Sequence, residues 1–408
     1  MSPAAPGASI LTGNEAAATA AGLCRVQVVA AYPITPQSPV VERLCAAVAT
    51  GQLNAEFVAV ESEHSAMAVC IAAATVGARV FTATSANGLA YMCEQLHWAA
   101  GARLPVVMCC VNRAMAAPWN VLNDQQDSMS QRDAGWIQLY ARNNQEILDT
   151  VVQAYRIAET ARLPVMVCYD GYLLSHTVMP VCVPSQAAAD AFLPGFTGGT
   201  LLDPDHPMNL NQVTLADPRS NEKGELCHGY MELRYLMQEA LEDARRTIDR
   251  VDEEFGAAFG RRWGGLCWTH RLEDAEVILV AAGSLASEAC AAADALRRLG
   301  PKAGVLGVRS YRPFPGQELA RALQGARVAA VFDKSLSYGH EGPICSDLKS
   351  VLHNNGGDGP AVHGYIAGLG GRDVNADALA QAAARSLEWV CAENGPKQTE
   401  WLNCRIDV

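Results

Sequence analysis

A short polar stretch near the N-terminus could hold a ligand. The segment AAYPITPQSP, residues 30–39, places Thr35 between two prolines directly after the apolar run VQVVAA. Each proline fixes its own φ and also restricts the residue before it, so we expect Pro33 and Pro36 to hold Ile34 and Thr35 close to extended geometry. The hydroxyl group of Thr35 would then point in one fixed direction, as a ligand contact requires.

The same stretch also has a purely structural interpretation. Ser38 is a residue type that caps helices, and Pro39 is favoured at the first helical position. Turns between a strand and a helix commonly use such residues. The stretch therefore predicts either a ligand contact or only a rigid turn.

Two glutamates, Glu61 and Glu63 in VESEH, follow a predicted strand at residues 57–60. A glutamate at the start of the next helix, from His64, would be stabilised by the helix dipole, which is a structural explanation. Glu63 lies among apolar neighbours, however, and could be shielded from water. A buried carboxyl group is suited to a short proton-sharing hydrogen bond with a heterocyclic nitrogen. Both interpretations stay open at this point.

Arg113 follows the apolar strand pattern VVMCCVN, close to the other candidate loops. Its guanidinium group is the preferred partner for a substrate carboxylate, through two parallel charge-assisted hydrogen bonds. The structural alternative is an ion pair with Asp124, Asp127 or Asp133.

Several motifs that bind cofactors are missing from the sequence. Gly357-Asp358-Gly359 resembles the start of the GDG…NN pattern that holds magnesium and diphosphate in thiamine enzymes, but no Asn-Asn pair follows it. The sequence has no Walker loop, no GxGxxG after a strand and no GxSxG turn. It also has no CxxC, which iron-sulfur clusters and structural zinc normally require. We therefore expect no metal site in this chain.

The length and composition set the broad class of the protein. A chain of 408 residues is long enough for two domains, and half of its residues are apolar. The net charge of −12 argues against nucleic acid or an anionic membrane as a partner, because both require a basic surface. The 14 cysteines are scattered through apolar runs, and neither a signal peptide nor an apolar run long enough for a bilayer is found. We expect a cytoplasmic protein with buried free thiols.

The first 177 residues alternate short apolar runs with helix-period patterns, as in a doubly wound α/β domain with a parallel sheet. Buried strands are predicted at residues 26–31, 57–60, 79–84, 105–111 and 164–169, and helices at 64–76 and 89–100 among the connections. Ligand sites in such sheets lie at the carboxyl ends of the strands. The candidate residues above would therefore meet at one edge of the sheet.

After residue 177 the sequence predicts an irregular segment, a long helix and a second domain. Residues 178–229 are rich in Pro, Gly, Asp and Asn and predict an irregular excursion over the surface. Apolar residues at spacings of three and four between Met237 and Phe255 then predict a long helix, packed on its own domain rather than in an intermolecular coiled coil. From Glu276 the order strand, helix, strand, helix, strand predicts a second, smaller parallel-sheet domain.

Taken together, the loops resemble a known family. In chain order the segments are GNEAAATAA, AAYPITPQSP, ESEHSAM, GARVFTATSANGLA, VNRA, NDQQDSMSQRDAGWIQLY, DGYLLSH and RSYRPFP. They resemble the α subunit of the 2-oxoacid:ferredoxin oxidoreductases, of which the pyruvate enzymes are the best known. The resemblance implies a thiamine diphosphate-binding domain of the pyrimidine type at residues 1–230, a linking helix at 231–268 and a transketolase C-terminal-like domain at 269–408.

The resemblance also implies roles for the candidate residues. Glu63 matches the glutamate that hydrogen-bonds the aminopyrimidine ring of thiamine diphosphate and favours the tautomer needed to activate it. Thr35 and Arg113 match the residues that meet the carboxylate of the substrate. Pro33, Ile34 and Gly88 match positions that line the cofactor.

In the family the α subunit works within a complex of several chains. The resemblance implies that a β subunit holds the diphosphate and Mg²⁺, and that [4Fe-4S] clusters lie on β and on a small ferredoxin-like δ subunit, beside a γ subunit. A 2-oxoacid would be decarboxylated and oxidised, coenzyme A would take the acyl group, and electrons would pass to ferredoxin or, through a flavin subunit, to NAD. The missing GDG…NN and CxxC motifs agree with this division.

One motif departs from the family pattern. Pyruvate enzymes commonly read Ser-Gln-Gly where this chain reads Ala86-Asn87-Gly88, and Met92, Met115 and Trp119 could shape room for a larger acyl group or simply pack in the core. Pyruvate and bulkier acids such as phenylglyoxylate therefore both remain candidate substrates. Two other functions stay open: a non-catalytic assembly subunit with this fold, and a self-sufficient transketolase-like transferase.

Overall fold

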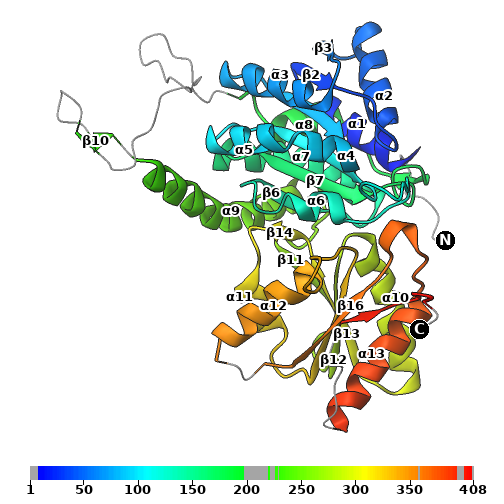
Figure 1. The fold of residues 1–408 in the computed structure, drawn as a ribbon. Helices are drawn as coiled ribbons and strands as arrows, with labels where there is room; N and C mark the ends of the chain where they lie inside the picture. Colours follow the sequence, from blue (N-terminus) through cyan, green and yellow to red (C-terminus); the bar gives the residue numbers. More distant parts are fainter. Residues whose placement is uncertain are drawn as a thin grey trace.

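The chain folds into two α/β domains, which lie one above the other in Figure 1. The computed structural model describes residues 8–196, 219–220, 226–227, 229–356, 359–392 and 399–406. Positions 357 and 358 of the GDG stretch lie outside the described residues. We call the seven-stranded sheet and its helices the first domain, and the six-stranded sheet and its helices the second domain.

The first domain contains the five predicted strands in parallel orientation. In spatial order these are β3 (Glu56–Ala59), β2 (Val28–Ala31), β4 (Val80–Thr84), β5 (Val107–Asn112) and β7 (Val165–Asp170). The strands β4, β5 and β7 are buried throughout, as expected when helices cover both faces of a sheet. Two strands were not predicted: β6 (Ile137–Tyr140) pairs with β7, and β14 (Ser310–Arg312) closes the edge in antiparallel orientation.

Helices cover both faces of this sheet (Figure 1). One face carries α1 (Gly13–Leu23), α2 (Ser38–Ala49), α7 (Asn144–Ala161), α8 (Gln186–Phe192) and α9 (Tyr230–Phe259). The other carries α3 (Glu63–Thr75), α4 (Ala86–Tyr91) and α5 (Cys93–Gly101), with the short α6 (Gln126–Ser130) beside α4. In addition, β1 (Ser9–Leu11) pairs with β8 (Met179–Val181).

Two local predictions were wrong. The helix expected at 89–100 begins at Ala86 and is divided into α4 and α5 at Met92, whose backbone N–H is shared between carbonyl groups of the preceding turn. Ser38 does not cap α2 but is its first residue, because Gln37 before it already has helical backbone angles and makes no side-chain cap. Pro39 is therefore the second residue of the helix, one position later than expected, and lies in the first turn.

The long helix α9 packs against the first domain, as predicted. Its residues Ala244, Ile248, Val251 and Phe255 are buried in the same core as α7. The predicted domain boundaries at residues 230 and 268 stay a prediction. Strand β14 comes after both of them in the sequence and yet joins the first sheet, so the two domains are not divided at a single point of the chain. Within 178–229, of which the structure describes 178–196, 219–220, 226–227 and 229, β8 and α8 are ordered elements and β9 (Arg219–Ser220) pairs with β10 (Leu226–Cys227).

The second domain has the predicted alternation of strands and helices. Its sheet runs β11 (Cys267–His270), β13 (Ala303–Val308), β12 (Val277–Ala282), β15 (Val328–Asp333), β16 (Ala361–Ile366) and β17 (Glu400–Trp401), with β11 antiparallel. The helices α10 (Ser284–Leu299) and α13 (Ala376–Cys391) cover one face, and α11 (Gly316–Ala322) and α12 (Pro343–Asn354) the other. A short 3-10 helix, η1 (Leu369–Gly371), follows β16.

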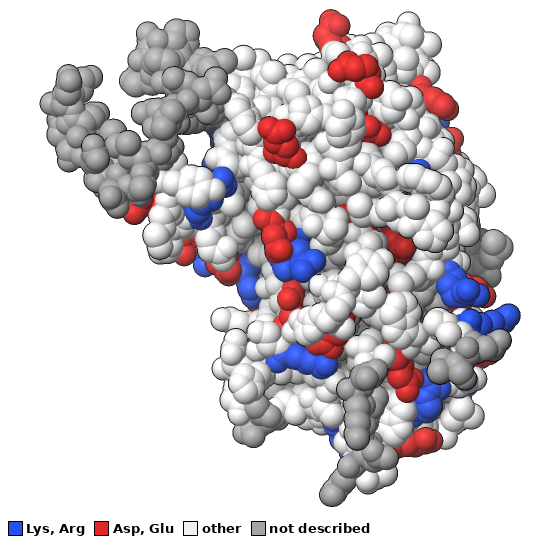
Figure 2. Space-filling view, viewed as in Figure 1, with Lys and Arg blue, Asp and Glu red and all other residues white. Residues whose placement is uncertain are grey.

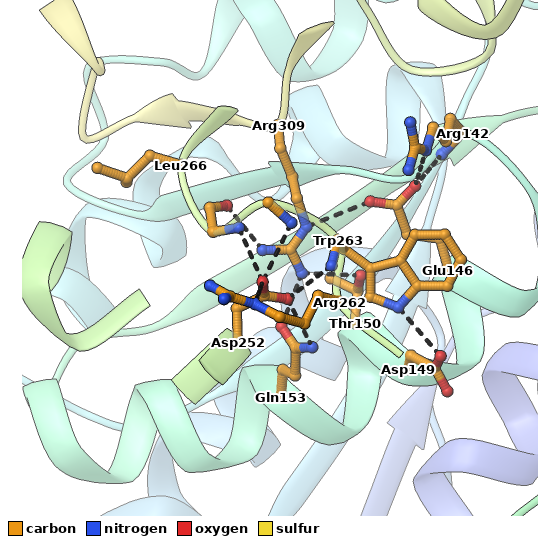
Figure 3. A network of polar contacts seen from close by, with 12 residues as sticks. Arg142, Glu146, Asp149, Thr150, Gln153, Asp252, Arg262, Trp263, Leu266 and Arg309 are labelled. Carbon is orange, nitrogen blue, oxygen red and sulfur yellow. Dashed lines mark hydrogen bonds and ion pairs between the residues drawn. The ribbon is translucent and has the colours of Figure 1, made fainter. Parts of the chain in front are cut away.

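The buried side chain of Arg309 forms hydrogen bonds between the two domains (Figure 3). Arg309 precedes β14 and is fully buried. Its guanidinium donates to Glu146 Oε1 at 3.2 Å, to Thr150 Oγ1 at 3.1 Å and to Gln153 Oε1 at 2.8 Å, all on α7. It also donates to the carbonyl oxygen of Gly265 at 2.9 Å. The charge is therefore paired and hydrogen-bonded, which burial requires.

The surface agrees with the negative net charge. On the face shown in Figure 2, acidic and basic side chains are interspersed in small groups, and no broad basic area covers the described residues. None of the helices in the described segments has both the length and the apolar composition to cross a membrane.

Candidate active site

The strand order brings the candidate loops to one edge of the first sheet. The loops after β3, β2, β4, β5 and β7 all leave from the carboxyl ends of adjacent parallel strands. The chain continues from β2 to β3 on one side and later to β4 on the other, so β2 and β4 form a topological switch point. Ligands of doubly wound sheets bind in the crevice at such a point.

Glu63 is the first residue of α3 and is buried, with 6% of its surface exposed. Ser62 caps the helix by accepting a hydrogen bond from the Ser65 backbone N–H at 3.2 Å, so Glu63 is not needed as the cap. Its carboxylate has no hydrogen bond or ion pair with any other residue that the structure describes. A buried carboxylate without a protein partner indicates a missing ligand.

The surroundings of Glu63 show where that ligand would lie. Gly88, on α4, faces the carboxylate: a Cβ atom there would lie 2.6 Å from Glu63 Oε1 and 2.5 Å from Thr84 Oγ1. The hydroxyl group of Thr84 is buried and also without a partner among the described residues. The glycine thus lets the Glu63 side chain and the Thr84 hydroxyl group lie directly against α4, where both are unpaired among the described residues.

Thr35 lies in a tight turn after β2. The Gln37 backbone N–H donates to the Ile34 carbonyl oxygen at 2.8 Å, and the Thr35–Pro36 peptide bond is cis. The side chain of Asn14 donates to the Pro36 carbonyl oxygen at 2.8 Å, which anchors the turn from α1. Thr35 itself is exposed, and its hydroxyl group makes no hydrogen bond within the described residues. The turn is therefore both rigid and able to present this hydroxyl group.

Arg113 reaches the same turn from β5. Its side chain is 9% exposed and its Nη1 donates to the Thr35 carbonyl oxygen at 2.6 Å. The expected alternative, an ion pair with Asp124, Asp127 or Asp133, is wrong, because these carboxylates accept other donors. Within the described ranges the guanidinium forms no ion pair, and its Nε is buried and unpaired. An unneutralised, largely buried cation next to Thr35 is suited to bind an anion.

Asp127 connects the two halves of the site and was not predicted as a functional residue. It is fully buried and accepts the backbone N–H groups of Ala86 at 2.9 Å and Arg113 at 3.0 Å. It also accepts the Asn112 side-chain amide at 2.7 Å. Burial raises the pKa of Asp127 above its usual range, while these donors oppose the shift. One carboxylate thereby fixes Arg113 relative to the start of α4.

The residues considered for the acyl pocket have different surroundings. Met92 is fully buried in the core, which supports a packing role. Trp119 is 75% exposed, and Met115 is half-buried on the same loop. Asn87 accepts the Ala116 backbone N–H at 3.0 Å, so it holds this loop in place.

The described residues contain no group of three or more His, Cys, Asp or Glu side chains placed to hold a metal ion. The site itself brings together an unpaired carboxylate, a hydroxyl group and a guanidinium group, which can bind an organic ligand through hydrogen bonds and charge. An aminopyrimidine ring beside Glu63 fits the donors and acceptors there, because its ring nitrogen can share a proton with the carboxylate.

Comparisons with known proteins agree with this arrangement. The family described as "Pyruvate flavodoxin/ferredoxin oxidoreductase, thiamine diP-bdg" matches residues 19–242, and "Pyruvate:ferredoxin oxidoreductase core domain II" matches residues 275–379. The chain is 43% identical to the pyruvate synthase subunit PorA of Methanothermobacter thermautotrophicus, over 97% of this chain and 98% of the relative. It is 45% identical to the ketoisovalerate oxidoreductase subunit VorA of Pyrococcus horikoshii, again over 97% and 98%.

A solved structure shows the same fold. The 2-oxoglutarate:ferredoxin oxidoreductase of Magnetococcus marinus, with 2-oxoglutarate, coenzyme A and succinyl-CoA bound, superposes with a TM-score of 0.68 at 18% identity. The match covers 93% of this chain but spans only 65% of that longer chain. With both family profiles and the near full-length relatives, we conclude that the chain belongs to the α subunits of the 2-oxoacid:ferredoxin oxidoreductases.

Proposed function

We propose that this α subunit holds the pyrimidine ring of thiamine diphosphate with Glu63 and captures the carboxylate of a 2-oxoacid with Arg113 and Thr35. The observation that carries the proposal is Glu63, a buried residue whose carboxylate lies against Gly88 and has no partner among the described residues. Thiamine diphosphate, when bound, supplies the nucleophile that adds to the 2-oxo carbon and accepts the electron pair left after decarboxylation.

Glu63 would control a proton at the cofactor ring. Its position at the start of α3 and its burial keep water from competing for the hydrogen bond. Gly88 on α4 and the turn residues Pro33 and Ile34 would line the ring. Because Ser62 already caps α3, the Glu63 carboxylate can turn toward the ligand without loss of a helix cap.

Arg113 and Thr35 would fix the substrate by its carboxylate. The guanidinium already donates to the Thr35 carbonyl oxygen, and this contact holds it against the turn that carries the Thr35 hydroxyl group. Charge-assisted hydrogen bonds of this kind contribute roughly 1.5 to 3 kcal/mol each when sheltered from water. Asp127 holds the backbone of Arg113, so little ordering is needed on binding.

The remaining parts of the reaction would lie on partner chains. We propose that a β subunit holds the diphosphate and Mg²⁺, that [4Fe-4S] clusters lie on β and on a ferredoxin-like δ subunit, and that a γ subunit completes the complex. Coenzyme A would receive the acyl group, and ferredoxin or a flavin subunit linked to NAD would receive the electrons. The names of the relatives, a pyruvate synthase and a ketoisovalerate oxidoreductase, support pyruvate or a bulkier 2-oxoacid as the substrate.

The proposal is tested by Glu63→Gln in the complex reconstituted with its partner chains. We expect 2-oxoacid-dependent reduction of an electron-accepting dye to fall by at least 100-fold, because an amide cannot share the proton. Wild-type activity with pyruvate, ketoisovalerate and phenylglyoxylate alike would instead identify an assembly subunit. Tight binding of thiamine diphosphate and Mg²⁺ by the isolated chain would identify a self-sufficient transferase.

A further inference from the structure

The loop that carries Arg113 lies across the junction of the two domains. We call residues 113–125, between β5 and α6, the Arg113 loop. Its first residue belongs to the site, through the Thr35 carbonyl oxygen and Asp127. Its far half contacts the second domain, toward which α6 and the neighbouring loops face in Figure 1.

One set of contacts joins the Arg113 loop to η1. The side chain of Asn120 donates to the Gly370 carbonyl oxygen at 2.8 Å, and the Gly370 backbone N–H donates to Asp124 Oδ2 at 3.0 Å. The Gly371 backbone N–H donates to the Asn123 carbonyl oxygen at 2.6 Å. Both glycines thus hold the loop through their backbones.

A buried lysine supplies the second set of contacts. Lys334 follows β15, is 5% exposed and donates to Asn123 Oδ1 at 3.0 Å and Asp170 Oδ1 at 2.9 Å. Its carbonyl oxygen accepts the Gln125 backbone N–H at 2.8 Å. Ser284, at the start of α10, also donates to Asp170. The ammonium group of Lys334 therefore forms hydrogen bonds with two residues of the first domain, Asn123 and Asp170.

The second domain is shaped to receive this loop. Three of its glycines have backbone angles in the left-handed region: Gly283 (φ +61), Gly370 (φ +57) and Gly371 (φ +73). An added Cβ atom would lie 2.9 Å from Gln125 Nε2 at Gly283, 2.5 Å from Asn120 Nδ2 at Gly370 and 2.5 Å from Leu122 Cβ at Gly371. A side chain at any of them would be strained and would push the loop away.

These contacts lie at the carboxyl ends of β12 and β15 in the second sheet. The strands β12 and β15 are neighbours, and the chain leaves them toward α10 on one face and α12 on the other. Such a switch point is where doubly wound sheets bind their ligands. Here Asp170 and the Arg113 loop reach into it, and a cavity of about 480 Å³ lies alongside, lined by Asn123, Lys334 and others.

We infer that the ligand crevice of the second domain serves to position the Arg113 loop, with Asn123 and Lys334 as positioning residues for capture of the 2-oxoacid carboxylate. This inference rests on the proposed role of Arg113. The second domain holds one end of the loop and Asp127 the other, so the orientation of Arg113 depends on both domains. Neither positioning residue touches the thiamine side of the site, where Glu63 and Gly88 lie.

The test uses Asn123→Ala and Asn120→Ala in the reconstituted complex, with Arg245→Met as the matched control. Arg245 also joins the domains, from α9 to the Phe314 carbonyl oxygen and Glu318, but has no contact with the loop. We expect Asn123→Ala to raise KM for the 2-oxoacid roughly tenfold, as loss of one charge-assisted hydrogen bond would. Binding of thiamine diphosphate should change by less than twofold, and Arg245→Met should change neither constant.

A double variant separates the inference from the proposed function. If Asn123 acts through Arg113, the variant Asn123→Ala/Arg113→Lys will have the same KM as Arg113→Lys alone. The inference is overturned if Arg113→Lys raises KM and the two asparagine variants do not, or if the effects multiply. An unchanged KM in Arg113→Lys would overturn the proposed function together with the inference. Asn120→Ala, on a more exposed residue, provides the same readout if Asn123→Ala fails to assemble.

Discussion

The Glu63 side chain packs directly against Gly88, so a single methyl group added at Gly88 would displace it. Gly88 lies inside α4, and its φ is not in the left-handed region, so alanine fits its backbone. Because alanine favours helix over glycine by about 1 kcal/mol, the change Gly88→Ala would stabilise the chain if room were available. It is not: the new atom would lie 2.6 Å from Glu63 Oε1 and 2.9 Å from Glu63 Cγ.

The expected loss of activity follows from the displacement of the carboxylate. Ordinary contact between the methyl group and Oε1 requires Glu63 to move by about 1 Å, and overpacking of this kind costs about 1 to 3 kcal/mol. A misplacement of about 1 Å at a catalytic group lowers the rate by about 100-fold. We therefore expect Gly88→Ala to reduce kcat/KM for the 2-oxoacid by about two orders of magnitude while the complex still assembles.

The assay is 2-oxoacid- and coenzyme A-dependent reduction of an electron-accepting dye by the reconstituted complex, together with thiamine diphosphate binding. Gly22→Ala on α1 is the matched control, because a Cβ atom there has no other atom within 4 Å and activity should be unchanged. If the Gly88→Ala complex binds the cofactor and turns over like wild type, the cofactor ring does not occupy the space beside Glu63.

Three further outcomes are expected. Arg113→Lys removes the planar pair of donors and the contact to Thr35, so kcat/KM for the 2-oxoacid should fall by about 10- to 100-fold in steady-state kinetics, and an unchanged value would refute carboxylate capture. Arg309→Met leaves the buried Glu146 with only Arg142 nearby, and thermal unfolding should show a loss of about 3 kcal/mol; equal stability would contradict the role of this domain contact. Burial raises the pKa of Asp333 to about 7, so the folded chain keeps a proton that the unfolded chain loses above about pH 4. Stability should therefore fall as the pH rises from 5 to 7 and then level off, and melting temperatures of Asp333→Asn should lack this slope.

The elements and loops of the first domain could be predicted because local patterns determine them. Strands β2, β4, β5 and β7 are largely apolar, as expected of strands covered on both faces, and β3 is an edge strand; each of the five was placed within two residues of its observed ends. Strand β6 was missed because Ile137–Tyr140 is short and contains a glutamine. Its partner β14 comes from a distant part of the chain, which no local pattern indicates.

The residues with a proposed chemical role could be named from the sequence, but the residues that support them could not. Glu63, Thr35 and Arg113 stand out because each is a charged or polar residue within four positions of the end of a predicted strand. Asp127 was considered only as an ion-pair partner of the Arg113 side chain, whereas it binds the backbone of Arg113. The contacts of Lys334 depend on how two domains pack, about 200 residues apart in the sequence, so they become visible only in three dimensions.

The central claim is that Glu63 shares a proton with the cofactor ring, and a structure of the reconstituted complex with thiamine diphosphate tests it most directly. We predict a Glu63 carboxylate oxygen at hydrogen-bonding distance, about 2.6 to 3.0 Å, from a nitrogen of the pyrimidine ring, with Gly88 next to the ring. A ring nitrogen that faces another group or solvent, with the Glu63 carboxylate out of reach, would contradict the account.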